Sequence, residues 1–487
     1  MESQDTFQDV ALDVEEEEPD WDPVTLYIES LPYNTNKQFR RTIQLDRKVD
    51  FGQYEDEKAP EYYEEKIDPE KLVVAAAQPP VPDFPDGGLR AYSVAVGASL
   101  LSFSTFGWIN AFGVFQTYYQ TKMFTDLSPD TIAWIGSVQY GMVLLPSALV
   151  GGMIDRGHYR LPLAISSIGY IISLFLTAEC KTFWEVILGQ GVATGLFAGM
   201  LFGGAPPVVS HWFRKKRALA LGILAMGSSI GGTILPIITN TLLPKVGYSW
   251  TMRIMAFILS TTVIAANLLV RTRLPPSKVK KSLLTFSAFK RLDFATCVIG
   301  YNVTFLGLYV PLTYMTLAAS PPSEGGNGGL SDTLAFYLIP LANGASLVGR
   351  LSSGVLADKF GTLNVLIPFT VVGGVMCFAW PFATHSIAGS VIVALIYGCA
   401  TGALVSMLPG APARMGPPET MGGRIGMAIS CSAFGIAFSL PIGGAILSSS
   451  NNSFEDVGYY AGAMVLAGCL LLGLSRRIGL GQWSGKY

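Results

Sequence analysis

A single arginine interrupts a long apolar run in the second half of the chain. The run 334–361 reads LAFYLIPLANGASLVGRLSSGVLADKFG, and Arg350 lies well inside it. A charge within a segment long enough to cross a bilayer is costly and persists only where it faces protein, water or a ligand. A guanidinium can bind an anionic oxygen pair through two parallel hydrogen bonds. Arg350 is therefore a candidate substrate-binding residue, and the alternative is a structural contact that holds a gate shut.

The end of this run repeats a turn that occurs about 200 residues earlier. The hexapeptide GVLADK from Gly354 matches GGMIDR from Gly151 at the glycine, the aspartate and the following cation. Two such copies suggest a chain built from two similar halves. An aspartate near the membrane surface can pair with a helix N-terminus or a cation of the other half, and such a contact locks one conformation. The repeat therefore predicts gate residues, with a solvated loop as the alternative, at Asp155, Arg156, Asp358 and Lys359.

The composition separates an acidic N-terminal segment from an apolar remainder. Of 487 residues, 50% are hydrophobic and 14% charged, whereas a soluble domain carries about 25% charged residues. Mean hydropathy is +0.42. Residues 1–85 hold 22 acidic and 8 basic side chains, and residues 86–487 hold 13 and 25, so net charges of −14 and +12 sum to −2. This asymmetry predicts an acidic tail attached to a membrane body with basic loops.

The segment 1–85 has neither a basic start nor an apolar core of the kind that a secretory signal peptide needs. Its glutamate-rich runs predict a disordered cytosolic tail. The six cysteines are scattered without metal-ligand spacing, so we expect no metal site, no disulfide framework and no cofactor.

Twelve apolar runs follow, and a membrane-spanning helix needs about 20 mostly apolar residues. The first six lie at about 91–118, 131–152, 161–178, 184–207, 217–240 and 249–270. The second six lie at about 294–318, 333–356, 363–383, 387–411, 421–447 and 457–475. The fold class expected is all-α integral membrane, with an N-terminal half, a basic cytosolic linker, a C-terminal half and a short C-terminal tail at 86–270, 271–292, 293–475 and 476–487.

Lysine and arginine concentrate in the even-numbered loops, which places both termini and the linker in the cytosol. This topology leaves one glycosylation sequon, at Asn451, in the last external loop. A second sequon, at Asn302, falls inside the seventh helix, where a glycan does not fit.

Polar and aromatic side chains within the spans are further candidates. Amides are expensive against lipid, so Asn110, Asn302 and Asn343 either line a cavity that binds substrate or form hydrogen bonds between helices. Aromatic side chains could wall a pocket or simply pack, namely Phe115, Tyr118, Tyr301, Phe305 and Tyr309.

The repeated turn GGMIDRGHYR resembles the loop signature of the major facilitator superfamily. The stretch PDGGLRAY at 85–92 resembles the Asp-Gly-Gly-Trp-x-Trp signature of the monocarboxylate porter family, and FGWINAFGVF at 106–115 and HWFRKKRALALG at 211–222 resemble its fungal members. The resemblance covers residues 85–475. It implies the major facilitator fold, with twelve transmembrane helices in two six-helix pseudo-symmetric halves that alternate access to a central site.

The sequence departs from the family pattern at several positions. Leu89 and Tyr92 replace the two tryptophans of the signature. Ser346 stands where carboxylate-carrying relatives have an aspartate one turn before the arginine, and the first helix lacks their lysine. Gln190 occupies a position where many members have an arginine. These departures argue against a strict proton–lactate mechanism.

The resemblance implies a secondary active transporter that moves a small organic, anionic or amphipathic molecule, and we favour efflux of a secondary metabolite. The alternatives are proton-coupled uptake of a monocarboxylate or vitamin, and a non-transporting membrane sensor. An enzyme would need a nucleophile or metal cluster in the spans, and none is visible. The basic runs are interpreted as topology determinants beside anionic lipid rather than nucleic-acid sites. The expected setting is the cell membrane, as a monomeric carrier whose partners are lipid, substrate and possible protons.

Overall fold

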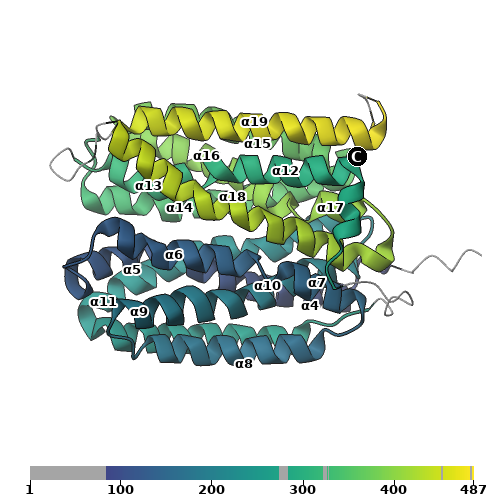
Figure 1. Ribbon diagram of the computed structural model, residues 1–487, viewed down its shortest axis with the longest axis horizontal. Helices are drawn as coiled ribbons and strands as arrows, with labels where there is room; N and C mark the ends of the chain where they lie inside the picture. Colours follow the sequence, from purple (N-terminus) through teal and green to yellow (C-terminus); the bar gives the residue numbers. More distant parts are fainter. Residues whose placement is uncertain are drawn as a thin grey trace, which may run out of the picture. The chain divides into compact units, whose positions relative to one another are not determined.

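The computed structural model describes residues 84–273, 283–321, 326, 328–450, 453–482 and 485–486. The predicted tail, apart from its last two residues, lies outside this range, as do the middle of the linker and Asn451. Residues from 82 onward belong to one compact unit. Its described part consists of helices and loops without a strand (Figure 1).

The N-terminal half is drawn in purple to teal in Figure 1. Its helices are α4 (Leu89–Ser102), η1 (Phe103–Gly107), α5 (Phe112–Tyr118), η2 (Tyr119–Met123), α6 (Pro129–Leu144), α7 (Ser147–Asp155), α8 (Arg160–Thr177), α9 (Phe183–Val186), η3 (Ile187–Thr194), α10 (Gly195–Ser210) and α11 (Arg217–Leu269). A proline pair, Pro206 and Pro207, lies inside α10, where neighbouring helices can supply the lost backbone partners.

The C-terminal half is drawn in green to yellow. It comprises η4 (Phe286–Lys290), α12 (Leu292–Leu308), α13 (Val310–Ala319), α14 (Asp332–Phe360), α15 (Thr362–Ala383), α16 (Ile387–Met407), α17 (Gly410–Arg414), η6 (Pro418–Thr420), α18 (Met421–Ser449) and α19 (Phe454–Leu480). The last helix is longer at both ends than the predicted 457–475.

Helix α11 accounts for two of the predicted membrane crossings. It has 53 residues, or about 80 Å of helix at 1.5 Å per residue, far more than one bilayer needs. Gly247, with φ 74° and ψ 177°, breaks it into two arms. Among the described residues eleven helical stretches are long and apolar enough to cross a membrane. Counting α11 twice agrees with the twelve predicted crossings.

The first predicted helix is interrupted rather than continuous. After α4 the chain passes through the π-helical segment η1, and the helix breaks at Asn110 and Ala111 before α5 begins. π-Helical turns inside α-helices occur frequently at functional sites. The whole stretch Leu89–Met123 still forms one candidate membrane span.

The two halves meet where α7 packs on α18 and where α11 packs on α14. Small residues allow the backbones to approach closely, as is usual between helices in lipid. A Cβ built at Gly151 would lie 2.1 Å from the carbonyl oxygen of Gly422. A Cβ at Gly222 would lie 2.6 Å from the carbonyl oxygen of Arg350. Glycine is therefore required at both crossings.

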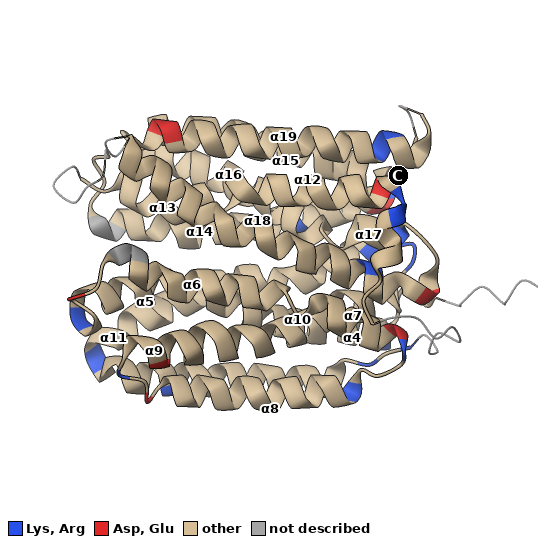
Figure 2. Ribbon diagram, in the orientation of Figure 1, with Lys and Arg blue, Asp and Glu red and all other residues tan. Residues whose placement is uncertain are grey.

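Charged side chains lie mainly at the ends of the helices, and lysines and arginines gather at the end that carries α7 and α17 (Figure 2). We call this the Asp155–Asp358 end, after the aspartate that ends α7 and the aspartate in the last turn of α14. The opposite end carries few cations, among them Lys122, Lys181 and Lys245.

Candidate functional site

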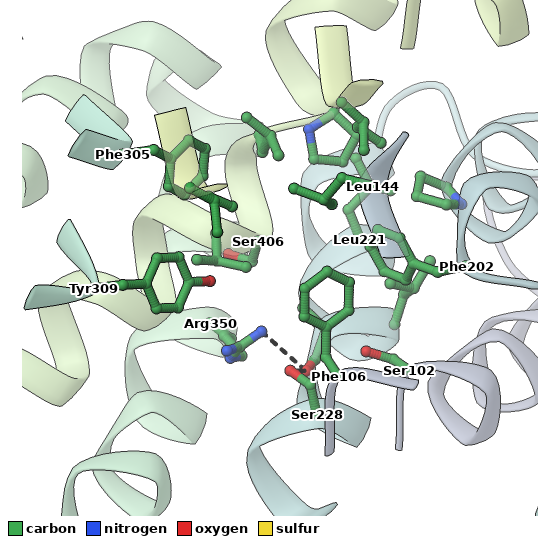
Figure 3. A pocket seen from close by; sticks show the side chains of 18 residues that line it. Ser102, Phe106, Leu144, Phe202, Leu221, Ser228, Phe305, Tyr309, Arg350 and Ser406 are labelled. Carbon is green, nitrogen blue, oxygen red and sulfur yellow. Dashed lines mark hydrogen bonds between the residues drawn. The ribbon is translucent and has the colours of Figure 1, made fainter. Parts of the chain in front are cut away.

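A cavity lies between the two halves (Figure 3). Its empty volume, which includes space open to solvent, is about 510 Å³. Apolar and aromatic side chains form most of its wall, and of the described residues that line it none is acidic. The lining comes from both halves: Ser102, Phe106, Leu144, Phe202, Pro206, Leu221, Leu224, Ala225, Ser228, Phe305, Tyr309, Arg350, Val405, Ser406, Leu408, Pro409, Ile429 and Ile436.

Arg350 brings the cavity its only charge among these lining residues. Its side chain comes from α14 and is 7% exposed, and Figure 3 shows it and the ring of Tyr309 projecting into the space between the halves. One guanidinium nitrogen, Nη1, donates to the carbonyl oxygen of Ala225 on α11 at 3.1 Å, whereas Nε has no hydrogen-bond partner. A buried charged donor without a partner is costly. The arginine thus contacts the other half and also keeps a donor for a further acceptor.

Ser346 lies one turn before Arg350 and joins α14 to α11. Its hydroxyl is 2.6 Å from the hydroxyl of Ser229 and donates to the carbonyl oxygen of Asn343 at 2.7 Å. Both serines are buried. The position where carboxylate-carrying relatives have an aspartate is therefore occupied by a neutral contact between the halves.

Gln190 likewise has a structural partner. Its Oε1 accepts a hydrogen bond of 2.6 Å from the Tyr119 hydroxyl, which also lies 3.2 Å from the hydroxyl of Tyr248. All three side chains are buried within the N-terminal half. None of the three lines the cavity.

The three predicted asparagines lie apart from the cavity wall. Asn110 and Asn343 meet over Gly232, where a built Cβ would lie 2.6 Å from Asn110 Nδ2 and 2.9 Å from Asn343 Oδ1. Asn302 lies elsewhere: its Oδ1 accepts from the amide of Gly435 at 3.1 Å and joins α12 to α18. Of the four predicted substrate-binding residues, the structure places only Arg350 in the cavity lining.

The aromatic wall was foreseen only in part. Phe305 and Tyr309 line the cavity and stack on each other with ring centroids 5.9 Å apart. Phe106 and Phe202 form the opposite wall, with centroids 4.6 Å apart, and sequence reasoning missed both. A phenylalanine in an apolar span carries no signal that distinguishes a cavity wall from a lipid-facing surface.

Phe115 and Tyr118 pack instead around Tyr248 in the N-terminal half. Tyr301 is a fully buried residue of α12 and does not line the cavity.

Asp155 binds the N-terminus of a helix from the other half. Its two carboxylate oxygens accept from the amides of Gly422 and Gly423 at 2.8 and 2.7 Å. These N–H groups belong to the first turn of α18, where no intrahelical acceptor is available and the helix dipole favours an anion. The adjacent Arg156 is exposed.

Asp358 makes the equivalent contact on the opposite pair of helices. Its carboxylate oxygens accept from the amides of Ala218 and Leu219 in the first turn of α11, both at 2.9 Å. The neighbouring Lys359 is exposed and its ammonium lies 5.2 Å from the Phe360 ring centroid. Both predicted aspartates therefore join the halves at the same end of the molecule.

Comparisons with known proteins agree on one family. The model of the Major Facilitator Superfamily matches residues 94–440. The transporter asaE of Aspergillus flavus is 33% identical over 417 residues, which is 85% of this chain and 92% of that protein. The aspyridones efflux protein apdF of Emericella nidulans is 34% identical over 406 residues, covering 83% and 81%. The fujikurins efflux protein of Gibberella fujikuroi is 34% identical over 397 residues, covering 81% and 84%.

Solved structures share the fold at low sequence identity. The human organic anion transporter MFSD10 (TETRAN) superposes with a TM-score of 0.61 at 15% identity, covering 79% of this chain and all of that chain. The fucose transporter FucP in the outward conformation gives 0.61 at 14% identity, covering 79% and 98%. The helical bundle, the family match and the relatives together establish that this chain is a multi-pass membrane transporter of the major facilitator superfamily and not an enzyme.

Proposed function

We propose that this transporter exports an amphipathic secondary metabolite that carries an acidic group. The observation that carries the proposal is the buried Arg350, whose Nε lacks a partner in a cavity otherwise lined by apolar, aromatic and hydroxyl groups. A carboxylate or enolate of the metabolite would satisfy the guanidinium, while its apolar body would lie against Phe106, Phe202 and Phe305. The absence of an acidic side chain among the described lining residues leaves the positive charge available to an anion.

The direction of transport is supported by two relatives whose names include an efflux function, for aspyridones and for fujikurins. Uptake with a proton receives less support from the site, because Ser346 has no titratable group in the pH range of a cell. The PDGG stretch and the two fungal-type segments support membership of the monocarboxylate porter family as a fungal-type member.

We assign the gate to the two aspartates and the cations that follow them. Each carboxylate binds a helix N-terminus of the other half, so separating the halves at this end must break four charge-assisted hydrogen bonds. Arg156 and Lys359 directly follow these aspartates in the chain and are exposed, and we assign them to the gate with the aspartates. Asn110 and Asn343, which both lie against Gly232, are proposed to close the path between the halves.

The orientation follows from the cations. The Asp155–Asp358 end carries most lysines and arginines (Figure 2), which supports a cytosolic position for this end and for both termini. The cell membrane and a monomeric carrier complete the proposal.

A deletion strain tests the function. Its medium should lack one acidic metabolite that accumulates inside the cells, and restoring the parent gene should return it to the medium. Arg350→Ala should reach the membrane, as shown by a fluorescent tag, but restore less than about a tenth of the export, since a charge-assisted pair is worth about 1.5–3 kcal/mol.

A matched control is Arg253→Ala, which removes an arginine whose ion pair with Glu179 lies near the opposite end and is partly exposed. It should export normally. Full export by Arg350→Ala would contradict the assignment, and a deletion strain with unchanged metabolites inside and outside would contradict efflux.

A further inference from the structure

Asp86, which belongs to the PDGG stretch before the first helix, binds a turn more than 120 residues away. One carboxylate oxygen, Oδ1, accepts from the amides of Arg214, Lys215 and Lys216 at 2.6, 2.6 and 3.3 Å. These amides form the turn that leads directly into α11. A single oxygen thus gathers three backbone donors, a concave arrangement of N–H groups that suits an anion.

The backbone of Asp86 is held in an uncommon conformation. Its φ is 52°, and among the described residues no other non-glycine has a positive φ. Its own amide donates to the carbonyl oxygen of Trp212 at 3.1 Å. A side-chain-bearing residue stays in the left-handed region only where its surroundings over-determine it. The carboxylate and the amide together fix Asp86 on the turn.

The same turn is tied to a third segment of the chain. The indole N–H of Trp212 donates to the carbonyl oxygen of Arg271 at 2.8 Å, and the Arg273 guanidinium lies 5.6 Å from the indole ring. Phe213 contacts the ring of Tyr92 on α4, with centroids 5.4 Å apart. The start of the first helix, the turn before α11 and the segment after α11 therefore form one contact cluster.

This contact cluster lies immediately before the N-terminus of α11, which Asp358 binds. Lys216 N donates to Asp86, and two residues later Ala218 N donates to Asp358. Arg217, between them, donates through Nε to the carbonyl oxygen of Phe213. The two carboxylates thus accept from two neighbouring groups of N–H donors in one continuous backbone, at 214–216 and 218–219. Asp86 belongs to the same half as this backbone and Asp358 to the other half.

We propose that Asp86 is a positioning residue for the gate. It fixes the turn before α11 so that the amides of Ala218 and Leu219 point at the carboxylate of Asp358, and it thereby favours the state in which the Asp155–Asp358 end is closed. This inference rests on the gate function proposed for Asp358. A merely structural role predicts a different result, namely lower stability without a change in how often the gate opens.

The test measures gate opening directly. Ser228 lines the cavity, so a Ser228→Cys reporter becomes accessible from the Asp155–Asp358 end only when that end opens. A membrane-impermeant maleimide is applied to inside-out vesicles, and the protein without the reporter gives the background from the six native cysteines. Asp358→Asn serves as the reference for an opened gate and should raise the labelling rate about fivefold to tenfold.

Asp86→Gly removes the carboxylate but tolerates the positive φ, so it should fold and should raise labelling by a similar factor. Asp86→Asn keeps one acceptor oxygen and also tolerates this φ. Asp86→Asn should be labelled at nearly the parent rate, because only Oδ1 of Asp86 accepts from the three amides. Combining Asp86→Gly with Asp358→Asn should add nothing to Asp358→Asn alone, since both act on one contact.

Labelling at the parent rate in Asp86→Gly, with increased labelling in Asp358→Asn, would overturn the role of Asp86 and leave the gate intact. Unchanged labelling in Asp358→Asn would overturn the gate itself, and the inference with it. A lower melting temperature of Asp86→Gly without increased labelling would reduce Asp86 to a structural residue.

Discussion

Asp155 and Asp358 make the same contact on opposite pairs of helices, but the turns that receive them are held in opposite ways. Asp86 holds the turn before α11 by accepting from its N–H groups. Arg424 holds the segment before α18 by donating to carbonyl oxygens, at 3.1 Å to Pro412 and 3.3 Å to Ala413 in α17 and at 2.9 Å to Pro417 in the turn that follows. An anion and a cation thus serve one purpose, because a backbone turn offers both donors and acceptors.

The two contacts also differ in what lies over them. The linker between the halves covers the Asp155 contact: a Cβ at Gly152 would lie 2.0 Å from the carbonyl oxygen of Leu283, and one at Gly423 would lie 2.1 Å from Thr285 Oγ1. Over the Asp358 contact lies the C-terminal segment, where Lys486 donates to the carbonyl oxygen of Asp358 at 2.6 Å. The two aspartate contacts are therefore alike in their own hydrogen bonds and differ in the segments that lie over them.

The largest effect should come from the buried cation. Arg424→Met removes a buried guanidinium that donates to three carbonyl oxygens of the segment before α18, and should lower the free energy of unfolding by about 3 kcal/mol. The melting temperature of the purified protein in detergent measures this. Arg253→Met, which breaks a partly exposed ion pair, should cost less than about 1 kcal/mol. Equal losses in the two variants would contradict the special role of Arg424.

Alanine substitutions of the glycines at the two helix crossings should destabilise the protein to different extents. Gly151→Ala, with its Cβ 2.1 Å from a backbone oxygen, should destabilise by about 2–3 kcal/mol, and Gly222→Ala, at 2.6 Å, by about 1–2 kcal/mol. Gly141→Ala is the control, because no atom lies within 4 Å of its built Cβ. A loss of stability in the control as large as in Gly151→Ala would show that packing at the crossings is not the cause.

Because the linker lies over the Asp155 contact, the substitution of Asp155 should increase labelling less than the substitution of Asp358. With the Ser228→Cys reporter, Asp358→Asn should raise maleimide labelling about fivefold to tenfold, and Asp155→Asn only about threefold. The difference is expected because Leu283 and Thr285 still bridge Gly152 and Gly423. Equal labelling in both variants would mean that the linker adds nothing to closure.

The smallest effect should be a pH dependence confined to the turn before α11. Burial, and to a lesser extent the charge of Arg217, lower the pKa of His211 to about 4. The folded state therefore binds this proton less readily than the unfolded state, where the pKa is about 6.5. Its contribution to stability is complete above pH 6.5 and is lost as the pH falls towards 4.

At pH 5.5 the loss should be about 1 kcal/mol. Melting temperatures of the parent and of His211→Gln between pH 7 and 5 measure the difference, and the variant should show the flatter profile. Parallel profiles would show that His211 does not titrate differently on folding.

The sequence predicted the parts of this protein that carry a local signal. Apolar runs of sufficient length gave the helices, because a bilayer selects for length and hydropathy. A charge inside such a run singled out Arg350, and the turn repeated at Gly151 and Gly354 singled out the two aspartates. The structure places these aspartates on helix ends of opposite halves.

Other features depend on which helices meet, and no local signal reveals that. Asn110 and Asn343 stand out as polar residues in apolar spans, yet they meet over Gly232 and not in the cavity wall. Phe106 and Phe202 line the cavity with the composition of ordinary packing residues. The repeated turn gave no indication of Asp86 or Arg424, because the two halves use different residues to hold the segments before α11 and α18.

Gly247 has a consequence beyond dividing α11 into two crossings. Its φ of 74° and ψ of 177° lie in a region that is essentially restricted to glycine. No other atom approaches its built Cβ within 4 Å, so the restriction comes from the backbone alone. The angle between two transmembrane arms is thus set by a single pair of dihedrals, and any descendant of this sequence that keeps the angle must inherit the glycine, although no side chain touches it.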